Sequence, residues 1–124
     1  MNVSQQTKIA VVGVSQDEKK YGARIFRDLL QANYNVVGVN HKGGVFNDQK
    51  LFITLDEIDP KPELVITVVP PKATLSIVQE CIKIGIKKIW MQPGSESKEA
   101  IDLAKSSDIE LIHQACFMVN EQLW

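Results

Sequence analysis

Short apolar runs alternate with segments of helical periodicity along the whole chain, and this alternation constrains the fold more than any other feature. The longest apolar runs have the β-branched content of strands buried on both faces, and they are Ile9–Val14, Asn35–Val39 and Leu64–Val69. Between and after these runs, apolar residues recur at helical spacing at about Gly22–Ala32, Pro71–Lys83 and Lys98–Ser106. Because strands that alternate with helices form parallel βαβ units, we predict an α/β fold around a parallel sheet.

Shorter elements complete this pattern. The segments "KIWMQ" and "ELIH" read as two further strands, and residues Leu51–Ile53 allow a short edge strand. After this edge strand we expect a helical turn that Thr54 caps, because threonine accepts hydrogen bonds from the first free amides of a helix. Gly85 is expected to end the helix over Pro71–Lys83.

Size and composition narrow the class of protein. A chain of 124 residues fits one domain with one sizeable core. Its formal net charge of -1 does not indicate a surface that binds nucleic acid. No stretch approaches the roughly 18 apolar residues of a membrane span. The first seven residues are polar and carry no apolar leader, so we expect a flexible N-terminus at residues 1–7 and a cytoplasmic protein. Cys81 and Cys116 fit neither a disulfide framework nor a metal site.

The loops after the predicted strands differ from the turns at their opposite ends. They read "GVSQDEKKYG", "NHKGG", "VVPPKA", "MQPGS" and "HQACF", and all are rich in small, polar or proline residues. In open parallel sheets, ligands bind at the carboxyl ends of the strands, where the strand order reverses. The sequence therefore predicts a single binding site at this edge of the sheet, without a metal and without a pair of catalytic carboxylates.

Several groups in these loops are suited to phosphate. They are the amides around Val14 and Ser15, the Ser15 hydroxyl, Lys19 or Lys20, the amide end of the helix near Gly22, and Lys42. The alternative interpretation is that Gly13 and Gly22 only permit a tight turn and a helix start.

The residues after the second predicted strand, where a nucleotide's ribose is expected, indicate which kind of nucleotide binds. The G-x-G-x-x-G spacing of a dinucleotide site is missing, and Asn40 stands where such sites carry an acid for the ribose hydroxyls. Lys42 adds positive charge nearby. These features favour a ligand with an additional ribose phosphate, either NADP or coenzyme A (CoA).

The motifs "VVGVSQDEKKYG", "VNHKGG", "VVPPKA", "IWMQPGSES" and "CFMV", in this order, resemble the small stand-alone CoA-binding proteins. These proteins are similar to the N-terminal domain of the succinyl-CoA synthetase α subunit. The resemblance implies a Rossmann-like, doubly wound parallel sheet that binds CoA. It assigns residues to three parts of the ligand: Gly13, Ser15, Lys20 and Gly22 to the diphosphate, Asn40 and Lys42 to the ribose, and Val69, Pro70 and Pro71 to the adenine or the start of the pantetheine. Gln92, beyond the predicted core residue Trp90, is expected to reach the ligand.

We therefore predict a module that binds CoA or an acyl-CoA and has no catalysis of its own. A protein partner or a second copy of the chain is a further expected partner. Two alternatives stay open at this point: an NADP-dependent reductase, and a thiol-based regulator or interaction protein that uses Cys116. Cys116 and His113 form the one Cys/His pairing near the site, but an extended chain between them would point their side chains to opposite faces.

Overall fold

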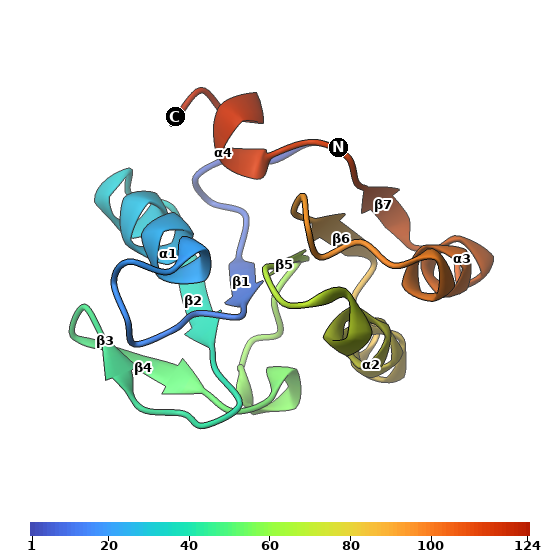
Figure 1. Cartoon of the computed structure of the whole chain (residues 1–124), viewed down its shortest axis with the longest axis horizontal. Coiled ribbons are helices and arrows are strands. Elements are labelled where there is room, and N and C mark those ends of the chain that lie inside the picture. The colour runs from blue at the N-terminus through green and yellow to red at the C-terminus, as the bar shows by residue number, and fades with distance from the viewer.

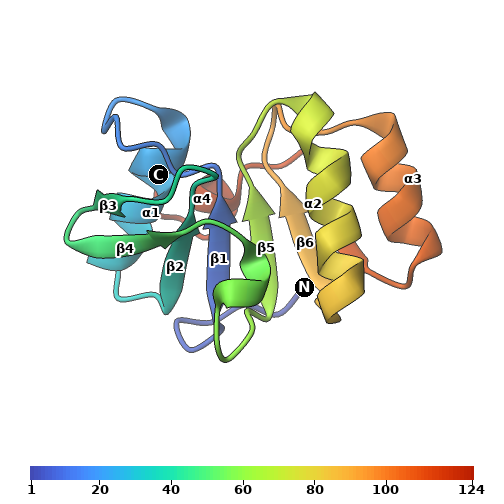
Figure 2. The same cartoon turned by 90° about the horizontal axis from the view of Figure 1, so that it is seen from below.

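The computed structural model describes residues 1–124 and confirms a single α/β domain with a doubly wound, Rossmann-like sheet (Figures 1 and 2). The seven strands are β1 (Ile9–Val12), β2 (Val36–Val39), β3 (Val45–Phe46), β4 (Gln49–Phe52), β5 (Leu64–Thr67), β6 (Lys88–Met91) and β7 (Glu110–Ile112). Their order in the sheet is β3-β4-β2-β1-β5-β6-β7. All pairs are parallel except β3 with β4.

Helices cover both faces of this sheet. They are α1 (Tyr21–Gln31), α2 (Pro71–Ile84), α3 (Lys98–Ser106) and the short α4 (Phe117–Asn120), with a 3-10 turn at Leu55–Glu57. Figure 2 shows α2 and α3 in front of the sheet, with α1 and α4 behind it. No helix combines the length and the apolar character needed to cross a membrane.

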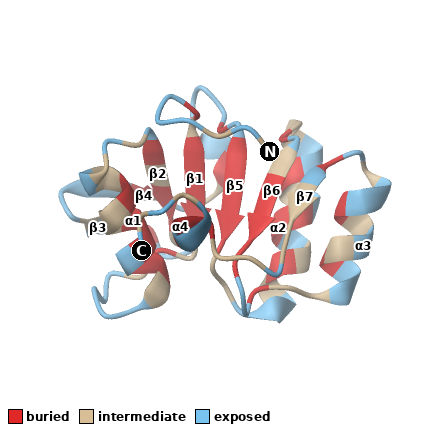
Figure 3. Cartoon of the chain, turned by 90° about the horizontal axis from the view of Figure 1, so that it is seen from above, coloured by how far each residue is buried: buried red, intermediate tan, exposed pale blue.

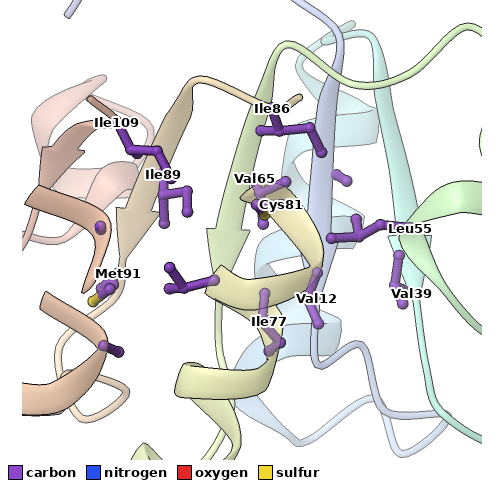
Figure 4. Packing of buried hydrophobic residues seen from close by; sticks show 14 of the residues in the cluster. Val12, Val39, Leu55, Val65, Ile77, Cys81, Ile86, Ile89, Met91 and Ile109 are labelled. Carbon is purple, nitrogen blue, oxygen red and sulfur yellow. The ribbon is translucent and has the colours of Figure 1, made fainter. Parts of the chain in front are cut away.

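The central strands are the most buried part of the fold, as the red strands of Figure 3 show. Every residue of β1 and of β5 is buried, which accounts for their continuous apolar sequences. On the face covered by α2 and α3, Cys81 of α2 lies over Val65 of β5, and Ile77, one turn earlier, lies beside Val12 of β1 (Figure 4). This burial raises the pKa of the Cys81 thiol to about 12, so that cysteine belongs to the core.

Two predicted strands end earlier than their apolar sequences do. The strand predicted over Ile9–Val14 stops at Val12, because Gly13 turns the chain with a φ of 111°. The strand predicted over Leu64–Val69 stops at Thr67, and the chain then turns toward the first residue of α2. As predicted, Gly85 ends that helix, in the left-handed conformation with a φ of 84°.

A β-hairpin occupies the edge where the sequence predicts only a strand over Leu51–Ile53. The observed strand β4 runs antiparallel to β3, and the turn between them places Asn47 and Asp48 at φ values of 55° and 61°. Such a turn is typical of two-residue hairpins. The predicted cap is confirmed, because Thr54 and Glu57 form a reciprocal capping box at the 3-10 turn.

Residues 1–7 cross the amino ends of the strands and make specific contacts there. Thr7 is buried, the Asn35 amide donates to the Gln5 carbonyl at 3.1 Å, and the Gln5 side chain donates to the Ala32 carbonyl at 2.6 Å. The flexibility predicted for this segment stays a prediction.

Candidate ligand-binding site

The strand order reverses next to β1, and this reversal opens a crevice at the carboxyl edge of the sheet. The chain runs outward from β1 to β2 and β4, then returns to β5 on the other side of β1. The loops that follow β1 and β5 therefore leave the sheet in different directions, at the upper edge of the view in Figure 2. Two neighbouring cavities lie at this edge.

The first cavity has a volume of about 610 Å³. Its walls are the loop after β1, the loop after β2, Ile53, the start of the β5–α2 connection and one face of α2. Among the predicted ligand residues, it brings together Gly13, Val14, Ser15, Asn40, Lys42, Val69 and Pro70.

The second cavity has a volume of about 440 Å³ and shares one rim with the first. The shared rim consists of Gly13, Ser15 and Val68–Pro70. Beyond it, the second cavity reaches Lys20–Gly22 at the start of α1 and Pro93–Ser95 after β6. The two cavities together are suited to an elongated ligand with its middle at the rim.

Backbone amides with free N–H groups surround this rim, although not all of the predicted ones. The amides of Gly13 and Val14 donate to the Val39 carbonyl at 3.0 and 3.1 Å, so the Val14 amide is already used. The amides of Ser15 and Gln16 and those of Tyr21–Ala23, the first three residues of α1, donate to no protein acceptor. Free amides at a helix start beside a loop bind anions.

Gly13 and Gly22 allow three backbone segments to meet at the rim. A Cβ atom on Gly13 would lie 2.1 Å from the Val68 carbonyl oxygen, and one on Gly22 would lie 2.2 Å from the Gly13 carbonyl oxygen. Both distances are far below van der Waals contact, so the backbone itself requires glycine at both positions, with or without a ligand.

Two lysines supply positive charge to the cavities. Lys20 lines the second cavity and Lys42 the first; both side chains are exposed, and neither makes an ion pair. Lys19, the alternative to Lys20, lines neither cavity. Asn40 lies between the loops, where its side chain donates to the Val14 carbonyl at 2.8 Å and accepts from the Lys42 amide at 2.8 Å. Asn40 thus holds the loop after β1 and the loop after β2 together, at the place predicted for a ribose.

Gln92 has a different environment from the one predicted. Its side chain is fully buried, lines neither cavity, and accepts from the Phe117 amide at 2.6 Å while donating to the Tyr21 hydroxyl at 2.6 Å. Pro71 is the first residue of α2 and also lines neither cavity. In the structure Gln92 therefore acts as a positioning residue that connects α1, β6 and α4.

Tyr21 links the second cavity to Cys116. The Tyr21 hydroxyl lies 3.4 Å from Cys116 Sγ, and burial together with this contact raises the pKa of Tyr21 to about 12. Burial of Cys116 disfavours its thiolate, but hydrogen bonds from Tyr21, Gln92 and the backbone of α4 outweigh it and lower the pKa of the thiol. Its polar neighbours are thus Tyr21 and Gln92.

The sequence analysis missed the contribution of α2 and of Ile53 to the first cavity. Ala73, Ser76, Ile77 and Glu80 line that cavity from one face of the helix. Their spacing of three and four residues was visible in the sequence, but of these four only Ile77 belonged to the apolar face used to predict the helix. The structure holds no group of three or more histidine, cysteine or acidic residues arranged to bind a metal.

Comparison with known proteins places these features in a family. The family model described as "CoA binding domain" matches residues 7–122. The α subunit of an ADP-forming acetate–CoA ligase from Pyrococcus furiosus is 28% identical over 119 residues, which cover 87% of this chain and 26% of that subunit. The chain thus spans about a quarter of this curated relative.

Solved structures show the same fold. A conserved hypothetical protein from Pyrococcus furiosus has a TM-score of 0.87 and 34% identity over 91% of this chain and 97% of its own. A hypothetical protein from Pyrococcus horikoshii has a TM-score of 0.88 and 30% identity, over 95% of this chain and 84% of its own.

Proposed function

This chain belongs to the CoA-binding domain family, and on that premise we propose that it binds coenzyme A or an acyl-CoA in the two joined cavities, without catalysis of its own. The observation that carries the proposal is the shared rim. There, Ser15 has a free amide and lines both cavities; beside it, the free amide of Gln16 lies at the first cavity and those of Tyr21 and Gly22, at the start of α1, lie at the second. A diphosphate in the middle of a long ligand matches this arrangement.

In this proposal each half of CoA occupies one cavity. The 3′-phosphoadenosine lies in the first cavity, where Lys42 is near the ribose phosphate and Val69 and Pro70 supply apolar contact. The diphosphate lies at the rim, with Lys20 and Gly22 on the side of the second cavity, and the pantetheine arm continues through that cavity toward Pro93–Ser95. Gln92 contributes by holding Tyr21 in the wall of that cavity rather than by touching the ligand.

The absence of catalysis is proposed from the nucleophiles available at the site. The Ser15 hydroxyl accepts from the Asp17 amide at 3.0 Å, and no histidine makes a hydrogen bond with it or with Cys116. A nucleophile without a positioned base is poorly suited to acyl or phosphoryl transfer. Because one relative is a ligase subunit, we propose that a protein partner supplies any chemistry, and that the protein works in the cytoplasm.

A second candidate function is favoured by one observation. The Cys116 thiol lies 3.4 Å from the hydroxyl of Tyr21, which lines the second cavity, and has a lowered pKa. A thiolate in that place suits a thiol-based regulator, because thiolates react faster than thiols with electrophiles and disulfides.

Isothermal titration calorimetry with CoA, acetyl-CoA, NADP and NAD tests the proposal. CoA is expected to bind most tightly, and Lys42→Ala is expected to weaken its binding about three- to tenfold, since one phosphate contact is lost. Lys87→Ala is the matched control, because Lys87 precedes β6 at the opposite edge of the sheet. Binding of NADP as tight as that of CoA would favour the reductase alternative and overturn the ranking.

A further inference from the structure

One face of α2 extends the first cavity away from the phosphate end of the site. Ala73 and Ile77 are its apolar residues, and Glu80 lies two turns beyond Ala73, about 10 Å along the helix axis. Since α2 begins at the carboxyl edge of the sheet, Glu80 is the cavity-lining residue of this helix that is farthest from the shared rim. A nucleotide with its phosphates at the rim would direct its base toward this end.

The Glu80 side chain is half-buried and held in place. One carboxylate oxygen, Oε2, accepts from the Leu55 amide at 3.1 Å, and the other oxygen has no partner in the protein. Glu80 also makes no ion pair. One oxygen is thus fixed by the 3-10 turn, and the other is free to accept a hydrogen bond from a ligand.

The surroundings of Glu80 are suited to a flat, mostly apolar group. Val39 and Ile77 line the cavity as buried residues, and Ile53 lines it with 52% of its surface exposed. The Ser76 hydroxyl, also in this wall, donates to the Ala73 carbonyl at 3.0 Å and has only its acceptor capacity left. On the α2 wall, this end of the cavity therefore offers apolar contact and hydrogen-bond acceptors.

We infer that Glu80 selects the base of the bound nucleotide by accepting a hydrogen bond from the amino group at position 6 of adenine. The inference rests on the proposed function, because it requires the nucleotide half of CoA to lie in the first cavity. A purine with a carbonyl oxygen at position 6, such as hypoxanthine, would face the Glu80 carboxylate with a second acceptor. The site would then place two acceptors together, and the base would have to shift to offer its N1 hydrogen to Glu80 instead.

The expected discrimination is large because a charged acceptor is involved. A site built to hydrogen-bond a polar group strongly rejects the analogue that lacks it, since its own polar group is left unpaired. For one hydrogen bond to a charged group, this corresponds to a difference of about ten- to a hundredfold in the dissociation constant.

The test compares CoA with its analogue in which hypoxanthine replaces adenine, by calorimetric titration of the full chain. The phosphates and the pantetheine arm are the same in both ligands, so only the base differs. The unmodified protein is expected to bind CoA at least tenfold more tightly. In Glu80→Gln the preference should be lost or reversed, because the amide oxygen keeps the hydrogen bond from Leu55 and the NH2 group then faces the base, where it donates to a carbonyl oxygen and not to an amino group. Glu99→Gln, an exposed change on α3 with the same loss of charge, should keep the full preference.

The outcomes of these titrations distinguish a failure of the role of Glu80 from a failure of the proposed CoA binding. Tight binding of CoA with equal affinity for the analogue would overturn the role of Glu80 and leave the proposed function intact. A full preference for CoA that persists in Glu80→Gln would also overturn that role. No binding of CoA would overturn the proposed function and this inference with it. Thermal unfolding of each variant, matched to the unmodified protein, shows that the fold is retained.

Discussion

Replacement of Gln92 with leucine is expected to destabilise the fold by about 2–4 kcal/mol. Leucine has nearly the same volume, so no large cavity forms, and the effect comes from lost hydrogen bonds. The buried Phe117 amide, which donates to Gln92 at 2.6 Å, would be left without an acceptor at a cost of about 1–3 kcal/mol. Loss of the bond to the partly exposed Tyr21 hydroxyl adds about 0.5–1.5 kcal/mol.

Urea unfolding followed by circular dichroism measures this change directly. For a domain of this size, the loss corresponds to a melting temperature lower by roughly 5–15 °C. Gln79→Leu makes the same substitution at an exposed position of α2 and should stay within about 0.5 kcal/mol of the unmodified protein. If Gln92→Leu left the free energy of unfolding unchanged but weakened CoA binding more than tenfold, Gln92 would be a ligand contact, as the sequence analysis predicts.

Three further predictions concern charge, thiol chemistry and a helix end. The affinity for CoA should fall as the salt concentration rises, and changing both Lys20 and Lys42 to alanine should make that fall less steep. Titrations at several salt concentrations measure this slope, and an unchanged slope in the double variant would show that neither lysine contacts a phosphate. Cys116 should react with iodoacetamide at a lower pH than an ordinary thiol, because its pKa is lowered, while Cys81 should stay unreactive in the folded protein. Mass spectrometry after timed alkylation distinguishes the two cysteines, and equal labelling of both would contradict the prediction. Gly85→Ala should cost about 1 kcal/mol in urea unfolding, since alanine must adopt a φ of 84°, and an unchanged midpoint would count against the proposed cap.

The order and type of the main elements could be predicted from the sequence because their signals are local. Buried parallel strands are continuous apolar runs, and the observed α3 matches its predicted range, Lys98–Ser106. The hairpin was missed because β3 has only two residues, too few to show alternation, although the Asn47–Asp48 pair was a usable turn signal. The four residues of α4 are likewise too few for helical periodicity.

The candidate site could be predicted less well from the sequence, because its geometry depends on contacts between residues that are far apart in the chain. The pattern places Gln92 at the end of a strand, but it cannot show that Tyr21 and Phe117 already use its polar atoms. It also cannot show that the Val14 amide is used by Val39, from a neighbouring strand. The lysines and glycines of the loops could be predicted as phosphate-site residues because their residue type and place alone suggest phosphate, and this stays a prediction.

The rim shared by the two cavities would make binding of an elongated ligand bivalent. If the nucleotide and the pantetheine arm each occupy one cavity, the covalent link between them holds the second half at a high effective concentration once the first half is bound. Either half alone would then dissociate far more readily than the whole molecule. A change at Gly13 or Val68–Pro70, which form the rim, would act on the coupling between the halves and not only on one contact. The loops after β1 and β5 would thus determine whether this domain retains a complete ligand in preference to its fragments.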